Sequence, residues 1–506
     1  MITGYMSSSY ETKKYGADKI ALLGLLIVSF VIARFIIVSR SAVVLSEPIV
    51  LEYAGLSVSV PVGNGWRSEK QWKYQDNSFT LSSYFDTGSG VAALAHCRYI
   101  LTAVDASADV IFGKKASAVG GVIAKTGQTQ AGKFTIDWAH IQKQEILFDT
   151  FFGTVRLPNN RQFDIEVFQN TGDSDLAEPV FERIVESLEF EDNKLLEAGS
   201  EVIAEIKSKG IRSFSPYLLA KEAQGVANLD DQTKEEFFLI RDSESGAIGF
   251  AMDLLGLRFA NRSVFLENQQ SYAPESLEAE VSLTDLSSDA QLEIHTVSFY
   301  YIRGRHQREQ AAFFQSSDNL DEFIWKSEIS GMAGRRGTEI ALDKFGQMTV
   351  KSLGPPDKQS NYRVAPAMVP DVLSELIFSQ MLDSYHKKIF VDIIEAEGTI
   401  MPTRISRIEA EEDGSLEAFY KTAAEQNFPY VFKVEFLNGR GFSQQVYLDN
   451  QRQISKILLR QERPYLLERT SLKDMVGQFP ERADYILEIL ERNKFSQQYR
   501  QQKNNQ

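Results

Sequence analysis

The sequence predicts an α+β protein in three parts: an N-terminal transmembrane helix, an antiparallel sheet with flanking helices, and a large curved antiparallel β-sheet domain with one inserted helix. Three observations predict this class. Residues 20–38 form an almost unbroken apolar run. Many later segments alternate apolar and polar residues at period two, and a few carry apolar residues at helical spacing instead.

The apolar run 20–38 reads IALLGLLIVSFVIARFIIV and is long enough to span a hydrocarbon core roughly 30 Å thick as a helix. Lys13, Lys14 and Lys19 precede it, whereas only Arg40 follows closely. Because basic residues favour the cytoplasmic side, we expect residues 1–19 to be a cytoplasmic tail. This predicts a single-pass protein of the cell (inner) membrane, with the bulk of the chain extracytoplasmic.

A cleaved signal peptide is the alternative for the same segment. Ser39-Arg40-Ser41 places small residues at the two positions that a signal peptidase inspects. The apolar run exceeds the usual length of the corresponding region in signal peptides, about 7–15 residues, which favours an uncleaved anchor.

Composition limits the function classes. The net charge of −15 argues against a nucleic-acid binder, because no large basic surface can form without acidic neighbours. The single cysteine, Cys97, excludes an intrachain disulfide. The chain beyond the run is too long for one core and is sufficient for two or three domains of roughly 150 residues.

Residues 43–192 are predicted to form the first domain. Strands are expected at 56–60, 79–85 and 134–138, and Pro158-Asn159-Asn160-Arg161 reads as a hairpin turn. A closing helix at 176–187 carries an apolar stripe of the kind that packs on a sheet. The stripe consists of Leu176, Val180, Phe181, Ile184, Val185 and Leu188.

The opening Val60-Pro61 and Gly65-Trp66, the central hairpins and the closing segment Val180–Phe190 resemble the PsbP-like family. The resemblance covers about 150 residues and carries no catalytic motif. It implies an antiparallel sheet flanked by helices and, by analogy, a binding or assembly role.

Residues 195–235 are predicted to be a helical linker and residues 236–471 an antiparallel β-rich domain. Asn438-Gly439 is a strong hairpin signal. The apolar phase flips near Thr296, which predicts a β-bulge. A helix is expected near 369–385, opened by Pro370. Predicted strands include 247–254, 262–267, 277–283 and 430–436.

This strand series, entered through Gly246-Ala247-Ile248-Gly249, is similar to the half-barrel of LolA-like lipoprotein carriers over residues 237–471. That resemblance implies a sheet curled around an apolar cavity. Residues 472–506 are predicted to be a C-terminal helix after Pro480, followed by a disordered polar tail from 497 to 506.

Four segments suggest chemistry without completing a motif. Gly127–Phe134 resembles a phosphate loop, but Phe134 stands where Ser or Thr must hold Mg²⁺, so a hairpin turn is expected. His96 and Cys97 are neighbours on a predicted strand and therefore point to opposite faces. The acidic segments 173–175 and 409–413 lack the ligand spacing of a calcium loop.

Arg303, Arg305 and Arg308 form the one dense basic stretch in an acidic chain, and they are candidates for binding an anion. We expect no catalytic residues, no cofactor and no metal. The predicted function is a protein-interaction or assembly module of the cell envelope, held at the membrane by one helix. The alternative is a carrier or sensor for a lipid-like ligand in a cavity of the β-rich domain.

Overall fold

The computed structural model describes residues 43–493, apart from 87–90, 104–105, 144–147, 171–176, 210–230, 243–245, 261–290, 316–321, 332–333, 344, 354–357, 366–367, 409–427, 439–440 and 461–464. The apolar run 20–38, the predicted strands 262–267 and 277–283, and the polar tail lie outside the described residues.

The predicted fold class is wrong. The described chain is mainly β, because strands supply most of its regular structure and its helices are short. The period-two segments extend further than expected; one of them, β13 (Gly246–Ala260), is fifteen residues long. Among the described residues, no helix combines the length and the apolar character needed to cross a membrane, so the N-terminal transmembrane helix is not supported.

The first unit contains two antiparallel sheets. Strands β1 (Ile49–Leu51), β2 (Leu56–Val58) and β11 (Glu189–Phe190) form a small sheet, and the short helix η1 (Glu52–Ala54) joins β1 to β2. The main sheet has the order β3-β5-β6-β10-β9-β8-β7, with β4 paired to β5. Its strands are β3 (Trp66–Ser68), β4 (Lys73–Gln75), β5 (Ser78–Asp86), β6 (Val91–Ile100), β7 (Val122–Ala131), β8 (Phe134–Lys143), β9 (Phe148–Leu157) and β10 (Arg161–Asn170).

Two helices, α2 (Ala108–Val119) and α3 (Ala177–Glu186), pack on this main sheet. The stripe predicted for the closing helix is confirmed, since its described members are buried in the core of the unit. The predicted hairpin is also confirmed. Asn159 and Asn160 take φ angles of 60° and 55° between β9 and β10, as a tight hairpin turn requires.

The second unit is built on one sheet, which has fifteen strands in the part of the chain described. Its order runs from β19 to β12, then to β26, and on to β20. The sheet therefore consists of two meanders joined where β12 pairs with β26, and its pairings are antiparallel except where β20 pairs in parallel with β21. The strands are β12 (Asp231–Asp242), β13, β14 (Gln291–Ile302), β15 (Arg305–Gln315), β16 (Phe323–Gly331), β17 (Gly334–Leu342), β18 (Gln347–Leu353), β19 (Gln359–Arg363), β20 (Met368–Pro370), β21 (Lys388–Ile394), β22 (Ile400–Ile408), β23 (Tyr430–Phe436), β24 (Ser443–Leu448), β25 (Ile454–Arg460) and β26 (Tyr465–Thr470).

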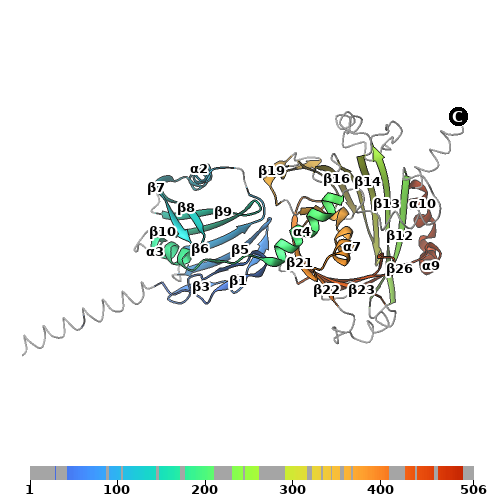
Figure 1. Ribbon diagram of the computed structural model, residues 1–506, viewed down its shortest axis with the longest axis horizontal. Helices are drawn as coiled ribbons and strands as arrows, with labels where there is room; N and C mark the ends of the chain where they lie inside the picture. The colour runs from blue at the N-terminus through green and yellow to red at the C-terminus, as the bar shows by residue number, and fades with distance from the viewer. Residues whose placement is uncertain are drawn as a thin grey trace, which may run out of the picture.

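The sheet curls around two helices, α4 (Lys194–Lys209) and α7 (Glu375–Asp383), which fill its concave side (Figure 1). Six consecutive residues of α7, from Leu376 to Met381, are buried. Gly199 of α4 approaches the carbonyl oxygen of Phe390 in β21 so closely that a Cβ atom would collide with it. The predicted linker helix therefore packs inside the second unit, and β12 already begins at Asp231 rather than after residue 235.

The β-bulge predicted near Thr296 is wrong, because β14 keeps a regular register with both β13 and β15. The alternation of apolar and polar residues in β14 changes phase near Thr296 for another reason. Phe299 and Tyr301 face an outer apolar cluster with Met475 and Phe479, formed by α9 (Leu472–Gln478), the short helix η5 (Pro480–Arg482) and α10 (Ala483–Asn493). These helices cover the outer side of the sheet (Figure 1).

Two further predictions concern local elements of this unit. The helix expected near 369–385 is present as η4 (Asp371–Leu373) followed by α7, and Pro370 caps it. β23 and β24 pair as a hairpin around Asn438, while residues 439–440 lie outside the described chain.

Candidate functional site

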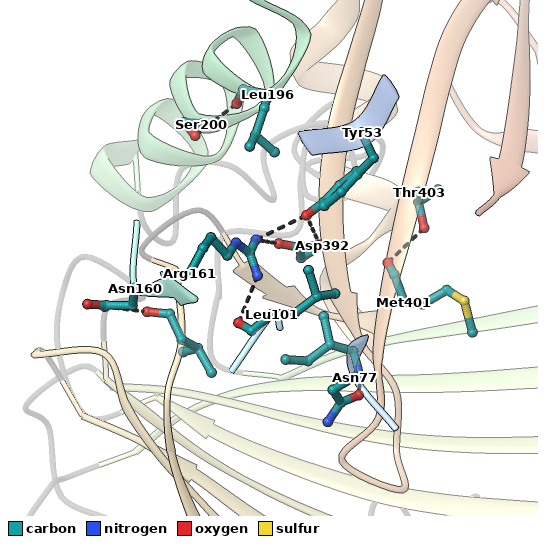
Figure 2. A network of polar contacts seen from close by, with 12 residues as sticks. Tyr53, Asn77, Leu101, Asn160, Arg161, Leu196, Ser200, Asp392, Met401 and Thr403 are labelled. Atoms are coloured by element: carbon teal, nitrogen blue, oxygen red, sulfur yellow. Dashed lines mark hydrogen bonds and ion pairs between the residues drawn. The ribbon is translucent and has the colours of Figure 1, made fainter. Parts of the chain in front are cut away.

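The two units meet at a buried polar cluster, the joint, which consists of Tyr53, Arg161 and Asp392 (Figure 2). Arg161 begins β10, Tyr53 lies in η1, and Asp392 lies in β21 of the second unit. The Arg161 guanidinium forms an ion pair with Asp392 and donates to the Leu101 carbonyl at 2.8 Å. The Tyr53 hydroxyl donates to Asp392 Oδ1 at 2.5 Å.

Burial sets the protonation states at the joint. The Arg161 and Asp392 side chains are 2% and 1% exposed. Burial alone would lower the pKa of Arg161, but the Asp392 carboxylate holds it above its usual value. Burial raises the pKa of Tyr53, so its hydroxyl stays neutral and remains a donor. Arg161 Nε has no hydrogen-bond partner among the residues that the structure describes, which leaves part of its desolvation cost uncompensated.

Further polar contacts connect the first unit to both ends of the large sheet. At one end, Arg363 N donates to the Ala103 carbonyl at 2.9 Å and Asn160 Nδ2 donates to the Val364 carbonyl at 2.8 Å. Near the other end, Tyr74 donates to the carbonyl of Ile400 in β22. One apolar core runs through both units. The first unit thus contacts β19 at one end of the sheet and β21 and β22 near the other.

A groove of about 850 Å³ lies beside the joint, open to solvent. Residues 46–53 form one wall, residues 68–72 a second, and Phe436, Leu437 and Gly441 from the second unit a third. Tyr53 belongs to both the groove and the joint. Val50, at the centre of β1, is 64% exposed, which is high for a valine in a strand. The groove is therefore a composite of the two units.

The charged residues of the groove fall into two groups. Glu69 pairs with Lys73 at 2.5 Å, and Glu52 pairs with Arg404 at 3.0 Å. By contrast, neither Glu47 nor Lys70 makes a hydrogen bond or ion pair through its side chain with any residue that the structure describes. The groove thus offers one free carboxylate and one free ammonium group.

A serine–histidine pair lies on the main sheet of the first unit, and the sequence analysis missed it. Ser82 and His96 are directly opposite on β5 and β6, with Ser82 Oγ 2.9 Å from His96 Nδ1. Burial lowers the pKa of His96, and Glu166 lies opposite it on β10. Ser82 is only 6% exposed and is not among the residues that line the groove. Aligning the two strands of the β5–β6 hairpin in the sequence could have revealed that Ser82 lies opposite His96.

The three arginines of the predicted anion site differ in what the structure shows of them. Arg303 and Gly304 take φ angles of 49° and 83° in the turn between β14 and β15, which brings Arg303 close to Arg305. The Arg303 guanidinium pairs with Asp242, whose side chain is 9% exposed. Arg305 is exposed, and the side chain of Arg308 lies outside the described residues. Anion binding by these arginines stays a prediction.

The remaining sequence candidates are Cys97, the segment Gly127–Phe134 and two acidic segments. Cys97 is fully buried, and burial raises the pKa of its thiol to about 12, which makes it unreactive. Of the segment Gly127–Phe134, only Gly132 and Lys133 form the expected β7–β8 hairpin turn, with Gly132 at a φ of 57°, because β7 extends to Ala131 and β8 begins at Phe134. The acidic segments 173–175 and 409–413 lie outside the described residues. Within the described residues, no group of three His, Cys, Asp or Glu side chains could hold a metal ion.

Comparisons with known proteins give little beyond architecture. No protein-family model matches the chain, and no curated protein is significantly similar in sequence. A β-barrel-like protein with domain of unknown function DUF1849 from Brucella abortus has 8% identity and a TM-score of 0.29, with 48% of this chain and 95% of that chain covered. A DUF1089 family protein from Pseudomonas aeruginosa has 11% identity and a TM-score of 0.21, with 35% and 93% covered.

A structure from Bacteroides thetaiotaomicron has 9% identity and a TM-score of 0.19, with 50% of this chain and 85% of that chain covered. TM-scores of this size carry no functional argument. The likeness is limited to β-sheet-rich architecture, and the PsbP-like resemblance is not confirmed.

Proposed function

We propose that this chain is a non-catalytic interaction module of the cell envelope whose binding site is the groove between its two units. The observation that carries the proposal is a contrast at the boundary between the two units: charged side chains are paired in the joint, whereas some of those in the adjoining groove are unpaired among the described residues. The joint satisfies its charges internally, whereas the adjoining groove presents Val50, Glu47 and Lys70 to solvent. Free polar groups beside exposed apolar surface are the usual features of a binding site.

The joint supports this role because it fixes the groove walls relative to each other. A binding surface that is already ordered loses less conformational entropy when its ligand arrives. The walls come from residues far apart in sequence, 46–53 on one side and Phe436, Leu437 and Gly441 on another, and the joint and its neighbouring contacts hold these parts together. A partner would therefore meet a pre-formed site.

The proposal includes the absence of catalysis. Catalysis requires a nucleophile, or an acid and a base, placed where a substrate can bind. The Ser82–His96 pair does not line the groove, and the groove brings no such pair to its surface among the described residues. The competing function, a carrier for a lipid-like ligand, needs space inside the curved sheet. Leu376, Ile377 and Met381 of α7 are packed there instead.

Site-specific photo-crosslinking in the full chain tests the proposal. A photoreactive residue at Val50, and separately at Lys70, is expected to capture the same envelope protein. The matched control is Val122, which is 59% exposed but lies on β7 away from the groove. Excess unlabelled full-length protein should compete for capture, and a probe placed in the captured protein should crosslink back to Val50. Equal, uncompeted capture at Val50 and Val122 would contradict the proposal.

A further inference from the structure

The wall of the groove formed by β1 is a free sheet edge. In the small sheet of the described chain, β1 pairs with β2 alone. The Gly55 carbonyl accepts a hydrogen bond from Glu191 N at 2.8 Å, so the backbone carbonyl of Gly55 points towards β11. The backbone N–H and C=O of the next residue, Leu56, therefore point towards β1. Antiparallel strands alternate in this way. The register pairs Leu51 with Leu56, which turns the N–H and C=O of Val50 away from β2.

We propose that the groove binds an extended peptide segment of the partner, which pairs with Val50 along β1 and places a basic side chain against Glu47. This inference rests on the proposed function and names the chemistry of the ligand. The backbone N–H and C=O of Val50 have no partner among the described residues. One residue of an added strand satisfies both groups at once, which a lipid chain cannot do.

The groove walls suit the side chains of such a segment. Residues of an extended segment point alternately to opposite sides, so every second side chain faces the same wall. On the third wall, Phe436 and Leu437 are half-buried and offer apolar contact. Trp72 stays fixed beside β1, because its Nε1 donates to the Ile49 carbonyl at 3.2 Å. β-branched or aromatic side chains therefore fit alternate positions.

The carboxylate of Glu47 favours a basic residue at one further position of the bound segment. Glu47 lies three residues before Val50, in a bend that precedes β1, and both residues line the groove. A Lys or Arg about three residues from the one that pairs with Val50 reaches this carboxylate. Lys70, on the second wall, is free to bind a carbonyl oxygen of the same segment.

A phage-displayed library of random heptapeptides, panned on the immobilised full chain, tests the inference. Selected sequences should alternate apolar and polar residues and should share a Lys or Arg at a fixed offset. Peptides made from the consensus are then measured by fluorescence anisotropy. Changing the basic residue to Glu, or methylating the backbone nitrogen that pairs with Val50, should weaken binding about tenfold, equivalent to about 1.4 kcal/mol.

Two substitutions make the matching test on the protein. Val50→Pro removes the N–H, and an edge strand tolerates proline where that N–H faces away from its neighbour. Val50→Thr keeps the N–H and is the control. Peptide binding should be lost with the first and kept with the second. If Val50→Pro fails to fold, the N-methylated peptide tests the same hydrogen bond from the ligand side.

The two proposals can fail separately. No enriched peptide, an enriched set without a basic position, or equal binding to Val50→Pro and Val50→Thr overturns the peptide inference. If capture from Val50 and Lys70 still identifies one partner in that case, the groove is a binding site for a different ligand. If the site-specific capture also fails, the proposed function falls with the inference.

Discussion

The joint and the groove lie side by side on one boundary, share Tyr53, and treat their charges in opposite ways. At the joint, Arg161 and Asp392 are almost completely buried and paired with each other. In the groove, Glu47 is exposed and unpaired among the described residues. The Asp392 carboxylate stabilises the fold and is buried with its partner, whereas the Glu47 carboxylate is not required for the fold and is exposed to solvent. This difference separates the residues that hold the units together from those available to a ligand.

The largest expected effect follows from breaking the joint. Asp392→Ala leaves the Arg161 guanidinium buried without its counter-charge, which is expected to lower the free energy of unfolding by about 3–5 kcal/mol. Denaturant unfolding of the purified protein measures it. The exposed pair partner Glu52 provides a matched control, since Glu52→Ala should cost less than about 1 kcal/mol.

A double variant separates the charge from the packing at the joint. Arg161→Met with Asp392→Leu removes both charges and keeps apolar volume, so it should be clearly more stable than Asp392→Ala. Equal stability of the single and double variants would show that the ion pair does not govern this boundary.

The second effect concerns the close packing of α4 on the curved sheet. Gly199→Ala places a methyl group against the Phe390 carbonyl and is expected to destabilise the protein by about 1–3 kcal/mol. Gly113 in α2 is the control, because nothing lies within 4 Å of an added Cβ there. Gly113→Ala should stabilise by up to about 1 kcal/mol, as measured by thermal unfolding. Similar changes in the unfolding temperature of Gly199→Ala and Gly113→Ala would contradict the close packing of α4 on β21.

A smaller effect should appear in the pH dependence of stability. Because burial lowers the pKa of His96, the unfolded chain binds a proton there more readily than the folded chain. The contribution of His96 is therefore fully present above about pH 6.5 and is lost as the pH falls below that value towards its folded pKa. His96→Gln should flatten this part of the stability profile. An unchanged profile would exclude His96 as its source.

The smallest effect is expected in the groove. Glu47→Gln should change the free energy of unfolding by no more than about 0.5 kcal/mol, because the exposed carboxylate has no partner to lose in the part of the chain that the structure describes. The same variant should weaken the consensus peptide. A large loss of stability would place Glu47 with the joint residues and remove it from the binding site.

Local patterns in the sequence predicted local structure well. The Asn159-Asn160 turn and the α3 stripe both follow from short-range spacing or residue type. The joint could not be predicted in this way. Arg161 and Asp392 are separated by more than two hundred residues, and each is an ordinary polar residue in its own strand. The phase flip at Thr296 misled for a related reason, since the helices that cover Phe299 come much later in the chain.

The pairing of β12 with β26 has a consequence for synthesis. Each meander can form from neighbouring hairpins as the chain emerges, but Phe237 meets Thr470 only after nearly all of the second unit has been made. Until then β12 has an unpaired edge, and α9 and α10 are not yet available to cover its outer side. The second unit should therefore become protease-resistant late and abruptly, in a nascent chain long enough to release β26.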